Sequence, residues 1–504
     1  MVTETSVIPA VTFLLPLAAG ALILFWKGID RRLQQGLPIL AAALVTAMGA
    51  WMARRVMGGV VLTTWSNELR VDGLSALMVI VIAIVALMAS LYSVRYLRLG
   101  ALIRRLGEAS AERRTRVFYG LVLWFQGTML WGCVTNNIVM LYVAIEATTL
   151  ASSLLVAFYW DRRALEAGYK YLMLLTIGIT FALFGCVLLY AAAAATRQLS
   201  GSSALLISEV RRVVPLMPAG TAAFAIAFLV IGFGTKAGIA PFHPWLPDAH
   251  AEAPTPISVL LSGVMIKMAL YAMVRTVSIF YPSWHLVNTF LVALGVFSML
   301  FGIVMAMSQD DLKRLLAYSS VSQMGYVLAG VGLGTYLGCY GGLYHLLNHA
   351  LFKSMLFLCV GAVIHSTGAR CISEVSGLRR RMPVTGSCFL LGALAIAGFP
   401  PLNGFWSKLT IYLALARGGL WWAAILAVAT SVLTMAVMVR AGIRVFWGTL
   451  RTPVVPESDV REVPPSMWLP TAVLGALCLL LGLYPQAAYP LLDRAAAALA
   501  TLGT

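Results

Sequence analysis

The sequence predicts an all-α polytopic membrane protein with about 14 transmembrane helices. Of its 504 residues, 61% are hydrophobic and only 11% are charged, and the mean hydropathy is +0.89. Soluble domains do not have this composition. Apolar runs of about 20 residues, the length that crosses a hydrocarbon core, recur along the chain without a sizeable polar domain between them. We expect spans at 7–26, 37–53, 73–94, 117–135, 138–159, 168–195, 221–241, 255–276, 285–307, 315–332, 337–364, 384–416, 420–447 and 467–490.

The first run lacks a basic leading region and a small-residue cleavage site, so we interpret it as a retained span and not as a signal peptide. The net charge of +17 could suggest nucleic-acid binding, but that function needs a basic soluble segment, and the sequence has none. Instead, 22 of the 36 Lys and Arg residues lie on odd-numbered loops and the adjoining span ends, and 9 lie on the even-numbered ones and the C-terminal tail. This positive-inside pattern predicts a multi-pass protein of a bacterial or archaeal inner membrane with both termini on the outer face.

No cofactor or metal site is expected in this chain. Its seven cysteines are scattered, odd in number and without a CxxC pair, so they indicate neither an iron–sulfur cluster nor a disulfide framework. No glycine-rich motif for NAD, flavin or ATP follows a strand. Any redox chemistry therefore belongs to another chain, and the sequence leaves open whether this chain is part of an enzyme.

Two similar segments interrupt long apolar runs with glycine and proline. "GFGTKAGIAPFHPWLPD" (232–248) and "IAGFPPLNGFWSKLTIY" (396–412) carry the expected helix breaks at Pro241, Pro400 and Pro401. Paired interrupted spans are typical of transporters built from repeats. We interpret the chain as a single transmembrane domain of four parts, although two unrelated proline kinks remain an alternative. These parts are helices 1–3 (1–116), a first five-helix repeat (117–276), a second five-helix repeat (285–447) and helix 14 (467–490).

Ionisable residues within the spans are the candidate functional groups, because each is costly in lipid and needs a partner, water or a function. Glu146 lies near the middle of its span, and Lys236 precedes the first break. We expect these two to pair. Between Lys236 and Lys267 lie two histidines and two carboxylates, and we consider these four residues a candidate point of proton uptake from the cytoplasm: His243, Asp248, His250 and Glu252.

A second group follows in "GLYHLLNHALFKSMLF", where His345, His349 and Lys353 recur every four residues and so share one helical face. Lys408 follows the second break. Buried amines and imidazoles can exchange protons near neutral pH, so we predict a proton relay in the membrane plane. Core packing of the histidines, snorkelling of Lys267 and a zinc site at the histidine pair are alternatives, although no third metal ligand is evident. The predicted relay residues are Glu146, Lys236, Lys267, His345, His349, Lys353 and Lys408.

Three motifs resemble the antiporter-like membrane subunits shared by respiratory complex I, energy-converting hydrogenases and Mrp cation/proton antiporters. They are "GTKAGIAPFHPWLPDAHAEAPTPISVLLSGVMIK" (234–267), "DDLKRLLAYSSVSQMGY" (310–326) and "YHLLNHALFKSMLF" (344–357). The resemblance implies a fourteen-helix fold, two inverted five-helix repeats, discontinuous helices 7 and 12, and proton translocation. The family's functional positions on helices 5, 7, 8 and 12 fall on Glu146, Lys236, Lys267 and Lys408, and its polar helix 11 positions fall on His345, His349 and Lys353.

Two further segments are similar to particular branches of the family. Residues 143–172 are similar to hydrogenase-4 component F, and "PPLNGFWSKL" is similar to the D subunit of Mrp. The resemblance implies other membrane subunits and a peripheral cytoplasmic module as partners, with redox or ion-gradient energy driving proton or sodium/proton movement. Alternatives are a membrane component of an inorganic-carbon uptake complex, an independent solute permease and a passive scaffold.

Overall fold

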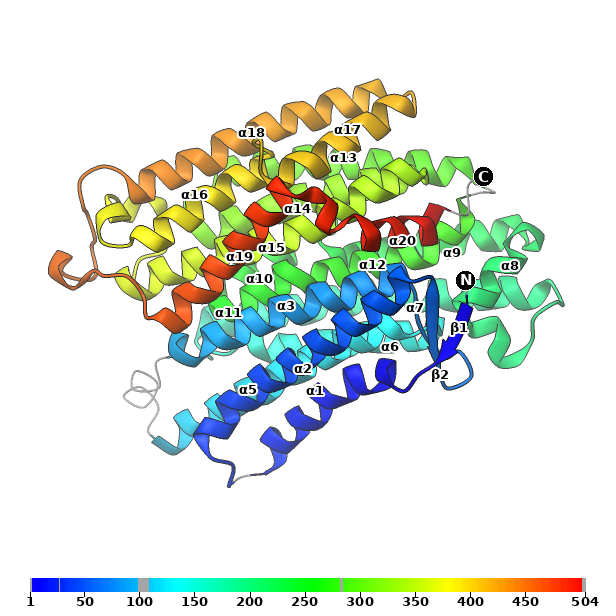
Figure 1. Cartoon of the computed structure of the whole chain (residues 1–504), viewed down its shortest axis with the longest axis horizontal. Helices are drawn as coiled ribbons and strands as arrows, with labels where there is room; N and C mark the ends of the chain where they lie inside the picture. Colours follow the sequence, from blue (N-terminus) through cyan, green and yellow to red (C-terminus); the bar gives the residue numbers. More distant parts are fainter. Residues whose placement is uncertain (1, 27, 98–107, 282–283, 501–504) are drawn as a thin grey trace.

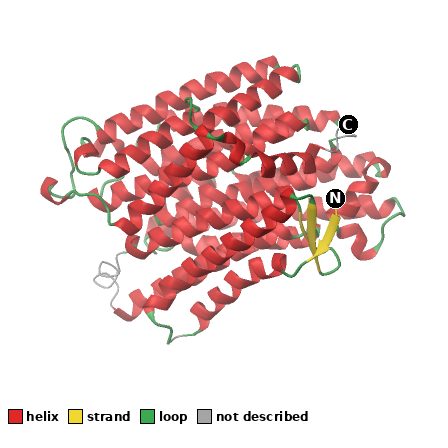
Figure 2. Ribbon diagram, in the orientation of Figure 1, coloured by secondary structure: helices red, strands yellow, loops and turns green. Residues whose placement is uncertain are grey.

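Long helices that run in roughly one direction make up nearly all of the computed structural model (Figures 1 and 2), which describes residues 2–26, 28–97, 108–281 and 284–500. The first are α1 (Ile8–Phe25), α2 (Arg31–Met57), α3 (Gly73–Tyr96), α5 (Glu108–Val134), α6 (Ile138–Val156) and α7 (Arg162–Ala195). The middle ones are α8 (Ile207–Val213), α9 (Ala219–Ala237), α10 (Trp245–Glu252), α11 (Thr255–Leu260), α12 (Ile266–Val277), α13 (His285–Met307), α14 (Leu312–Gly332) and α15 (Tyr336–Thr367). The last are α16 (Pro383–Ala397), α17 (Asn403–Arg417), α18 (Trp421–Phe446), α19 (Pro465–Leu483) and α20 (Tyr489–Ala500).

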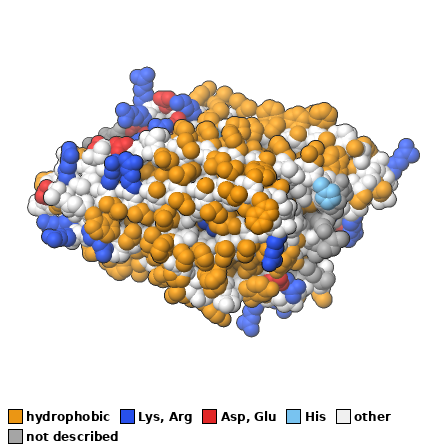
Figure 3. All heavy atoms as spheres, turned by 90° about the horizontal axis from the view of Figure 1, so that it is seen from above, with side chains coloured by type: hydrophobic (Ala, Val, Ile, Leu, Met, Phe, Trp, Pro, Cys, Tyr) orange, Lys and Arg blue, Asp and Glu red, His pale blue; other side chains and the backbone are white. Residues whose placement is uncertain are grey.

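Within the described residues, 12 helices are long and apolar enough to cross a membrane, which agrees with a multi-pass membrane protein. Two of the predicted spans are not among these 12 helices. Span 315–332 corresponds to α14, which is rich in serine, and span 384–416 is divided into the shorter helices α16 and α17. Figure 3 shows the lateral surface as a broad apolar belt with most of the Lys and Arg side chains toward its ends.

A small three-stranded sheet lies at the same end of the bundle as both termini (Figure 1). Strand β1 (Val2–Thr5) is parallel to β2 (Val60–Thr64), which is antiparallel to β3 (Leu69–Val71). The expectation of an all-α fold missed this sheet. Its strands have only three to five residues and adjoin apolar runs with a much stronger signal for helix.

Several membrane helices begin at a polar residue whose side chain accepts hydrogen bonds from free backbone N–H groups. Asp72 accepts from Leu74 and Ser75 at the start of α3, both at 3.1 Å. Asn137, Asp161 and Asp311 cap α6, α7 and α14 in the same way. The polar residues that separate apolar runs in the sequence therefore fix where these helices start.

The two interruptions share one pattern of backbone hydrogen bonds. After α9, Gly238 adopts φ +68° and its N–H donates to the carbonyl of Thr235, while the N–H of Ile239 donates to that of Gly234. After α16, Gly398 adopts φ +81° and donates to Ala395, while Phe399 donates to Leu394. Both are Schellman caps, in which glycine permits the left-handed conformation. Pro241, Pro400 and Pro401 lie in the segments that follow these caps.

Segment Thr255–Phe280 and helix α15 lie in the interior of the bundle, covered by the surrounding helices. The first is not a regular α-helix, because Leu261–Met265 forms a π-helical turn between α11 and α12. Such turns are frequent at functional sites. Because α15 packs against α14, α16, α17 and the π-helical turn, it connects the elements on both sides of the bundle.

A largely buried ion pair joins the start of α3 to the end of α12. Arg275 donates to both carboxylate oxygens of Asp72, at 2.5 and 3.1 Å, and both side chains are 13% exposed. Burial raises the pKa of Asp72, but the charge and hydrogen bonds of Arg275 outweigh this effect, so the pKa of Asp72 is below its usual value.

We predict that Asp72→Ala lowers the free energy of unfolding by about 3 kcal/mol, because Arg275 loses its counter-charge and α3 loses its cap. Glu4→Ala removes an exposed ion pair with Arg55 and should cost less than about 1 kcal/mol. Denaturant titration in detergent measures both. The Asp72 contribution is fully present above about pH 4 and is lost as the pH falls through the lowered folded-state pKa. Equal losses for the two variants would contradict this assignment.

Candidate functional site

Glu146 and Lys236 are connected through a threonine. The Lys236 ammonium, at the end of α9 and 1% exposed, donates to the hydroxyl of Thr149 on α6 and to the carbonyl of Ile145 at 3.3 Å. The Thr149 hydroxyl donates to Glu146 Oε2 at 3.2 Å. The three polar groups therefore form a directed chain of hydrogen bonds from amine to hydroxyl to carboxylate.

The expected pairing of Glu146 with Lys236 stays a prediction: the two groups interact electrostatically and are connected through Thr149. No ion pair between them occurs among the described residues, because one helical turn places Thr149 between the two charges. Glu146 is only half-buried, and the exposed Thr176 of α7 donates to its Oε1 at 3.2 Å. Sequence reasoning missed Thr149 and Thr176. The i, i+3 spacing of Glu146 and Thr149 on one helix was the available signal.

Lys267 follows the π-helical turn, and its ammonium donates to the carbonyl of Ser262 within that turn. The Ser262 hydroxyl in turn contacts Ser320 of α14 at 2.8 Å. The turn lies directly against α15, because a Cβ added to Gly263 would be 2.4 Å from Ser354 Oγ. The π-helical turn thus accepts a hydrogen bond from Lys267 and also brings this segment close to α15.

Lys353 of α15 is fully buried, and its ammonium donates to the Leu316 carbonyl and the Ser319 hydroxyl of α14, both at 2.5 Å. It also lies 5.6 Å from the ring centroid of Phe357. Lys267 and Lys353 interact electrostatically, and no carboxylate forms a salt bridge with either in the described chain. Because two buried ammonium groups repel each other, adding a proton to one opposes adding a proton to the other.

His349 lies one turn and His345 two turns before Lys353 on α15, and both are fully buried. His345 contacts Ser407 Oγ of α17 through Nδ1 and Gln323 Oε1 of α14 through Nε2, both at 3.0 Å. Neither ring nitrogen of His349 has a hydrogen-bond partner among the described residues. Its ring centroid is 6.4 Å from that of His345. The two rings and Lys353 therefore follow one another along α15.

Lys408 lies beyond the second interruption, and its ammonium returns to the end of the preceding helix. It donates to the carbonyls of Ile396 and Ala397 at 2.8 and 3.4 Å and to Ser431 at 2.9 Å. It also lies 4.5 Å from the centroid of the Tyr326 ring, which is 5.6 Å from His345. A cavity of about 270 Å³, lined by Phe399, Tyr412 and Ser431 among others, reaches Lys408 from the side of the bundle.

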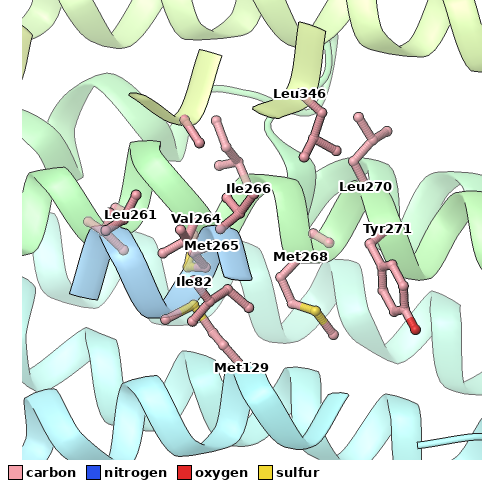
Figure 4. Packing of buried hydrophobic residues seen from close by; sticks show 14 of the residues in the cluster. Ile82, Met129, Leu261, Val264, Met265, Ile266, Met268, Leu270, Tyr271 and Leu346 are labelled. Atoms are coloured by element: carbon pink, nitrogen blue, oxygen red, sulfur yellow. The ribbon is translucent and has the colours of Figure 1, made fainter. Parts of the chain in front are cut away.

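The structure thus brings the predicted residues together in two groups. One group contains Glu146 and Lys236, and the other contains Lys267, Lys353, His349, His345 and Lys408. No hydrogen bond links Lys236 with Lys267 in the described part of the chain. Figure 4 shows apolar side chains around the segment that precedes Tyr271, including Val264, Met265 and Met268. The described hydrogen bonds therefore do not connect the two groups.

The four residues considered for proton uptake lie on or beside α10. His250 is fully buried and stacks on Phe357 at 4.8 Å between centroids, and neither of its ring nitrogens has a partner among the described residues. His243 precedes α10 and contacts Phe301. The carboxylates differ from the histidines because both are engaged in ion pairs: Asp248 with Arg314 and Lys170, and Glu252 with Arg370.

These ion pairs anchor α10 to the second half of the chain. Arg370 contacts Asp311 at 2.5 Å as well as Glu252 at 3.4 Å. Burial lowers the pKa of Arg370, but the two carboxylates more than offset it and raise that pKa above its usual value. Sequence reasoning missed Arg314, Asp311 and Arg370, since ion pairs between distant segments have no local signature.

No group of three or more His, Cys, Asp or Glu side chains that could hold a metal ion occurs among the described residues. The His345–His349 pair is bounded by Ser407, Gln323 and aromatic rings and not by a third ligand. The zinc alternative therefore has no support from the geometry of these residues.

One known family matches the part of the chain that contains all three of the motifs noted in the sequence. Residues 135–434 match the family described as NADH:quinone oxidoreductase/Mrp antiporter, transmembrane. The chain belongs to this family. Residues 63–104 also match the N-terminal part of chain 5 of NADH-ubiquinone oxidoreductase (complex I). This membership confirms the resemblance inferred from the three motifs.

Relatives from three kinds of complex are similar to this family member. NADH-quinone oxidoreductase subunit N of Desulforudis audaxviator is 33% identical over 84% of this chain and 83% of its own length. The hydrogenase-4 component F homolog of Methylacidiphilum infernorum is 35% identical over 69% of this chain and 73% of its own. An Na(+)/H(+) antiporter subunit of Alkalihalophilus pseudofirmus is 32% identical over 95% of this chain and 62% of its own.

Solved structures show the same fold. A chain of the archaeal membrane-bound sulfane sulfur reductase superposes with a TM-score of 0.87 at 27% identity, over 99% of this chain and 98% of its own. A chain of the Mrp complex from Dietzia sp. gives a TM-score of 0.85 at 23% identity, over 98% of both chains. Both of these solved chains are parts of larger complexes.

We predict that Gly404→Ala displaces α17 and with it Lys408, because the added Cβ would lie 1.9 Å from the Ala395 carbonyl oxygen of α16. The expected loss is at least about 2 kcal/mol in the free energy of unfolding. Gly36→Ala is the matched control, since nothing lies within 4 Å of its Cβ position and alanine favours the helix by up to about 1 kcal/mol. Equal stability of the two variants in a denaturant titration would show that α16 and α17 do not pack as described.

Proposed function

We propose that this chain is the proton-translocating membrane subunit of a multisubunit complex, in which a partner supplies redox or ion-gradient energy. One observation carries the proposal: Lys267, Lys353, His349, His345 and Lys408 are at most 1% exposed, follow one another through the bundle and have no carboxylate ion-pair partner among the described residues. Static burial of so many basic groups is unfavourable. A function that requires them to gain and lose protons gives a reason for their presence.

In this proposal a proton passes between groups that change charge in turn. Thr149 connects Glu146 to Lys236, so movement of either helix would change the charge environment of the amine. Water would have to bridge the interval between Lys236 and Lys267, which no hydrogen bond of the described residues spans. From there Lys353 and the two histidines lead to Lys408. Amines and imidazoles carry protons and not sodium, so we favour protons over sodium/proton exchange as the direct cargo.

The finer architecture is also part of the proposal. We infer fourteen spans and two inverted five-helix repeats, 117–276 and 285–447, after helices 1–3 (1–116) and before helix 14 (467–490). The common Schellman cap of the two interruptions supports the repeats. In each half, moreover, a long helix packs against both pieces of a broken one: α7 against α9 and α10, and α15 against α16 and α17.

The charge distribution supports an orientation with both termini on the outer face of a bacterial or archaeal inner membrane. Proton uptake would then occur at the cytoplasmic end of α10, where His243, Asp248, His250 and Glu252 lie. A peripheral cytoplasmic module is the expected further partner. The relatives reported above are oxidoreductase, hydrogenase and antiporter subunits, which favours this function over a role in inorganic-carbon uptake.

We predict that Lys353→Ala and Lys408→Ala, each in the assembled complex, reduce proton translocation by at least about tenfold, because each removes one proton carrier from the series. Dye quenching in inverted membrane vesicles measures this loss. Arg417→Gln is the matched control, since it removes an exposed positive charge from the same helix as Lys408. A passive scaffold would instead retain full translocation in both lysine variants once assembly is verified on native gels.

We further predict that Thr149→Val slows translocation several-fold, whereas Thr149→Ser largely restores it. Valine keeps the shape of threonine but can neither accept a hydrogen bond from Lys236 nor donate one to Glu146. Serine retains the hydroxyl and can do both. The same vesicle assay compares the two variants. If valine and serine had the same effect, the hydroxyl would not be the link between the two charges.

A further inference from the structure

Two arginines near one end of α18 have no partner in the described chain. Arg440 and Arg444 are exposed and form no hydrogen bond or ion pair there. They lie one turn apart, so their side chains emerge from the same face about 6 Å apart. Placing a charged arginine on a lipid-facing helix costs free energy. We therefore expect a negatively charged group from outside the chain to bind this pair.

The depth of the pair is indicated by tryptophans on the same helix. Trp421 and Trp422 begin α18, and Trp447 follows its last residue. Because tryptophans favour the membrane–water interfaces, these residues mark where α18 leaves the hydrocarbon region at each end. At 1.5 Å per residue, Arg440 lies about 10 Å inward of Trp447 along the helix axis. Arg444 lies only about 5 Å inward of Trp447, and long arginine side chains extend toward the interface, so both guanidinium groups can reach the headgroup level.

A hollow of about 250 Å³ adjoins both guanidinium groups. It is lined by residues of α13, α14 and α18, and also by Ile372, with Met307, Asp310 and Val437 among them. Asp310 already accepts hydrogen bonds from the backbone N–H and the hydroxyl of Ser373. Exposed apolar side chains continue from the hollow toward the middle of the belt, on α13 at Val304 and on α18 at Val432.

We propose that this hollow binds an anionic phospholipid whose phosphate lies between Arg440 and Arg444 and whose acyl chains lie along the groove between α13 and α18. Guanidinium groups bind phosphate oxygens in pairs of parallel hydrogen bonds, so two of them match one phosphate group. Basic pockets between membrane helices on the cytoplasmic side are a recurrent form of headgroup site. The positive charge distribution places this end of α18 on that side. This proposal does not depend on the proton relay.

The test uses the purified, delipidated full chain in detergent. Added dioleoyl-phosphatidylglycerol should raise the thermal unfolding temperature by more than the zwitterionic dioleoyl-phosphatidylcholine, and native mass spectrometry should show retained anionic lipid. Replacing both arginines, in R440Q/R444Q, should remove at least half of the difference between the two lipids. The control R417Q, an exposed arginine on neighbouring α17, should leave that difference unchanged.

Three outcomes would overturn the proposal. An undiminished difference in R440Q/R444Q would place the lipid elsewhere, and an equal loss in R417Q would indicate non-specific surface charge. Stabilisation by inorganic phosphate to the same extent as by phosphatidylglycerol would show that the site takes a free anion and not a lipid. The double variant R440K/R444K keeps the charge without the planar fork and should show an intermediate effect. It also retains a measurable response if the glutamine variant fails to fold.

Discussion

Backbone carbonyl groups hold every buried lysine that the structure describes. Lys236 donates to Ile145, Lys267 to Ser262, Lys313 to Ala253, Lys353 to Leu316, and Lys408 to Ile396 and Ala397. In a low-dielectric interior an ammonium group needs acceptors, and a carboxylate would keep it permanently charged. Carbonyl groups solvate the amine in either protonation state. The irregular helices of the bundle can be understood as a way to place free carbonyl groups at membrane depth.

The irregular helices meet this need. Ile396 and Ala397 are the last residues of α16, so their carbonyls have no partner within that helix and lie at its negative end. Ala253 lies between α10 and α11, and Ser262 lies within the π-helical turn. Where the helix is regular, as at Ile145 and Leu316, a hydroxyl from the same helix adds a second acceptor: Thr149 in one case and Ser319 in the other. Glycines at the interruptions permit the turns, and close packing around α15 excludes lipid.

Much of this arrangement could be predicted from the sequence. Glycine and proline within apolar runs predicted both interruptions, and lysines within apolar segments predicted the buried basic groups. Both signals are local in the sequence and strong. The role of Thr149 between Glu146 and Lys236 was not predicted, since the rotation of α6 against α9 depends on packing. The break in the described hydrogen bonds between Lys236 and Lys267, the ion pairs of α10 and the short sheet were not predicted. Each depends on contacts between segments that are distant in the chain.

The central claim is that the buried lysines, which donate hydrogen bonds to backbone carbonyl groups, gain and lose protons within the folded protein. Nitrogen-15 NMR of the lysine side chains, in lipid and with single lysine variants for assignment, tests this most directly between about pH 5 and pH 9. We expect at least one of Lys267, Lys353 and Lys408 to change between amine and ammonium within this range, while the exposed Lys170 stays ammonium throughout. If all three interior lysines kept one charge state across the range, they could not carry protons in turn, and the relay would have to be abandoned.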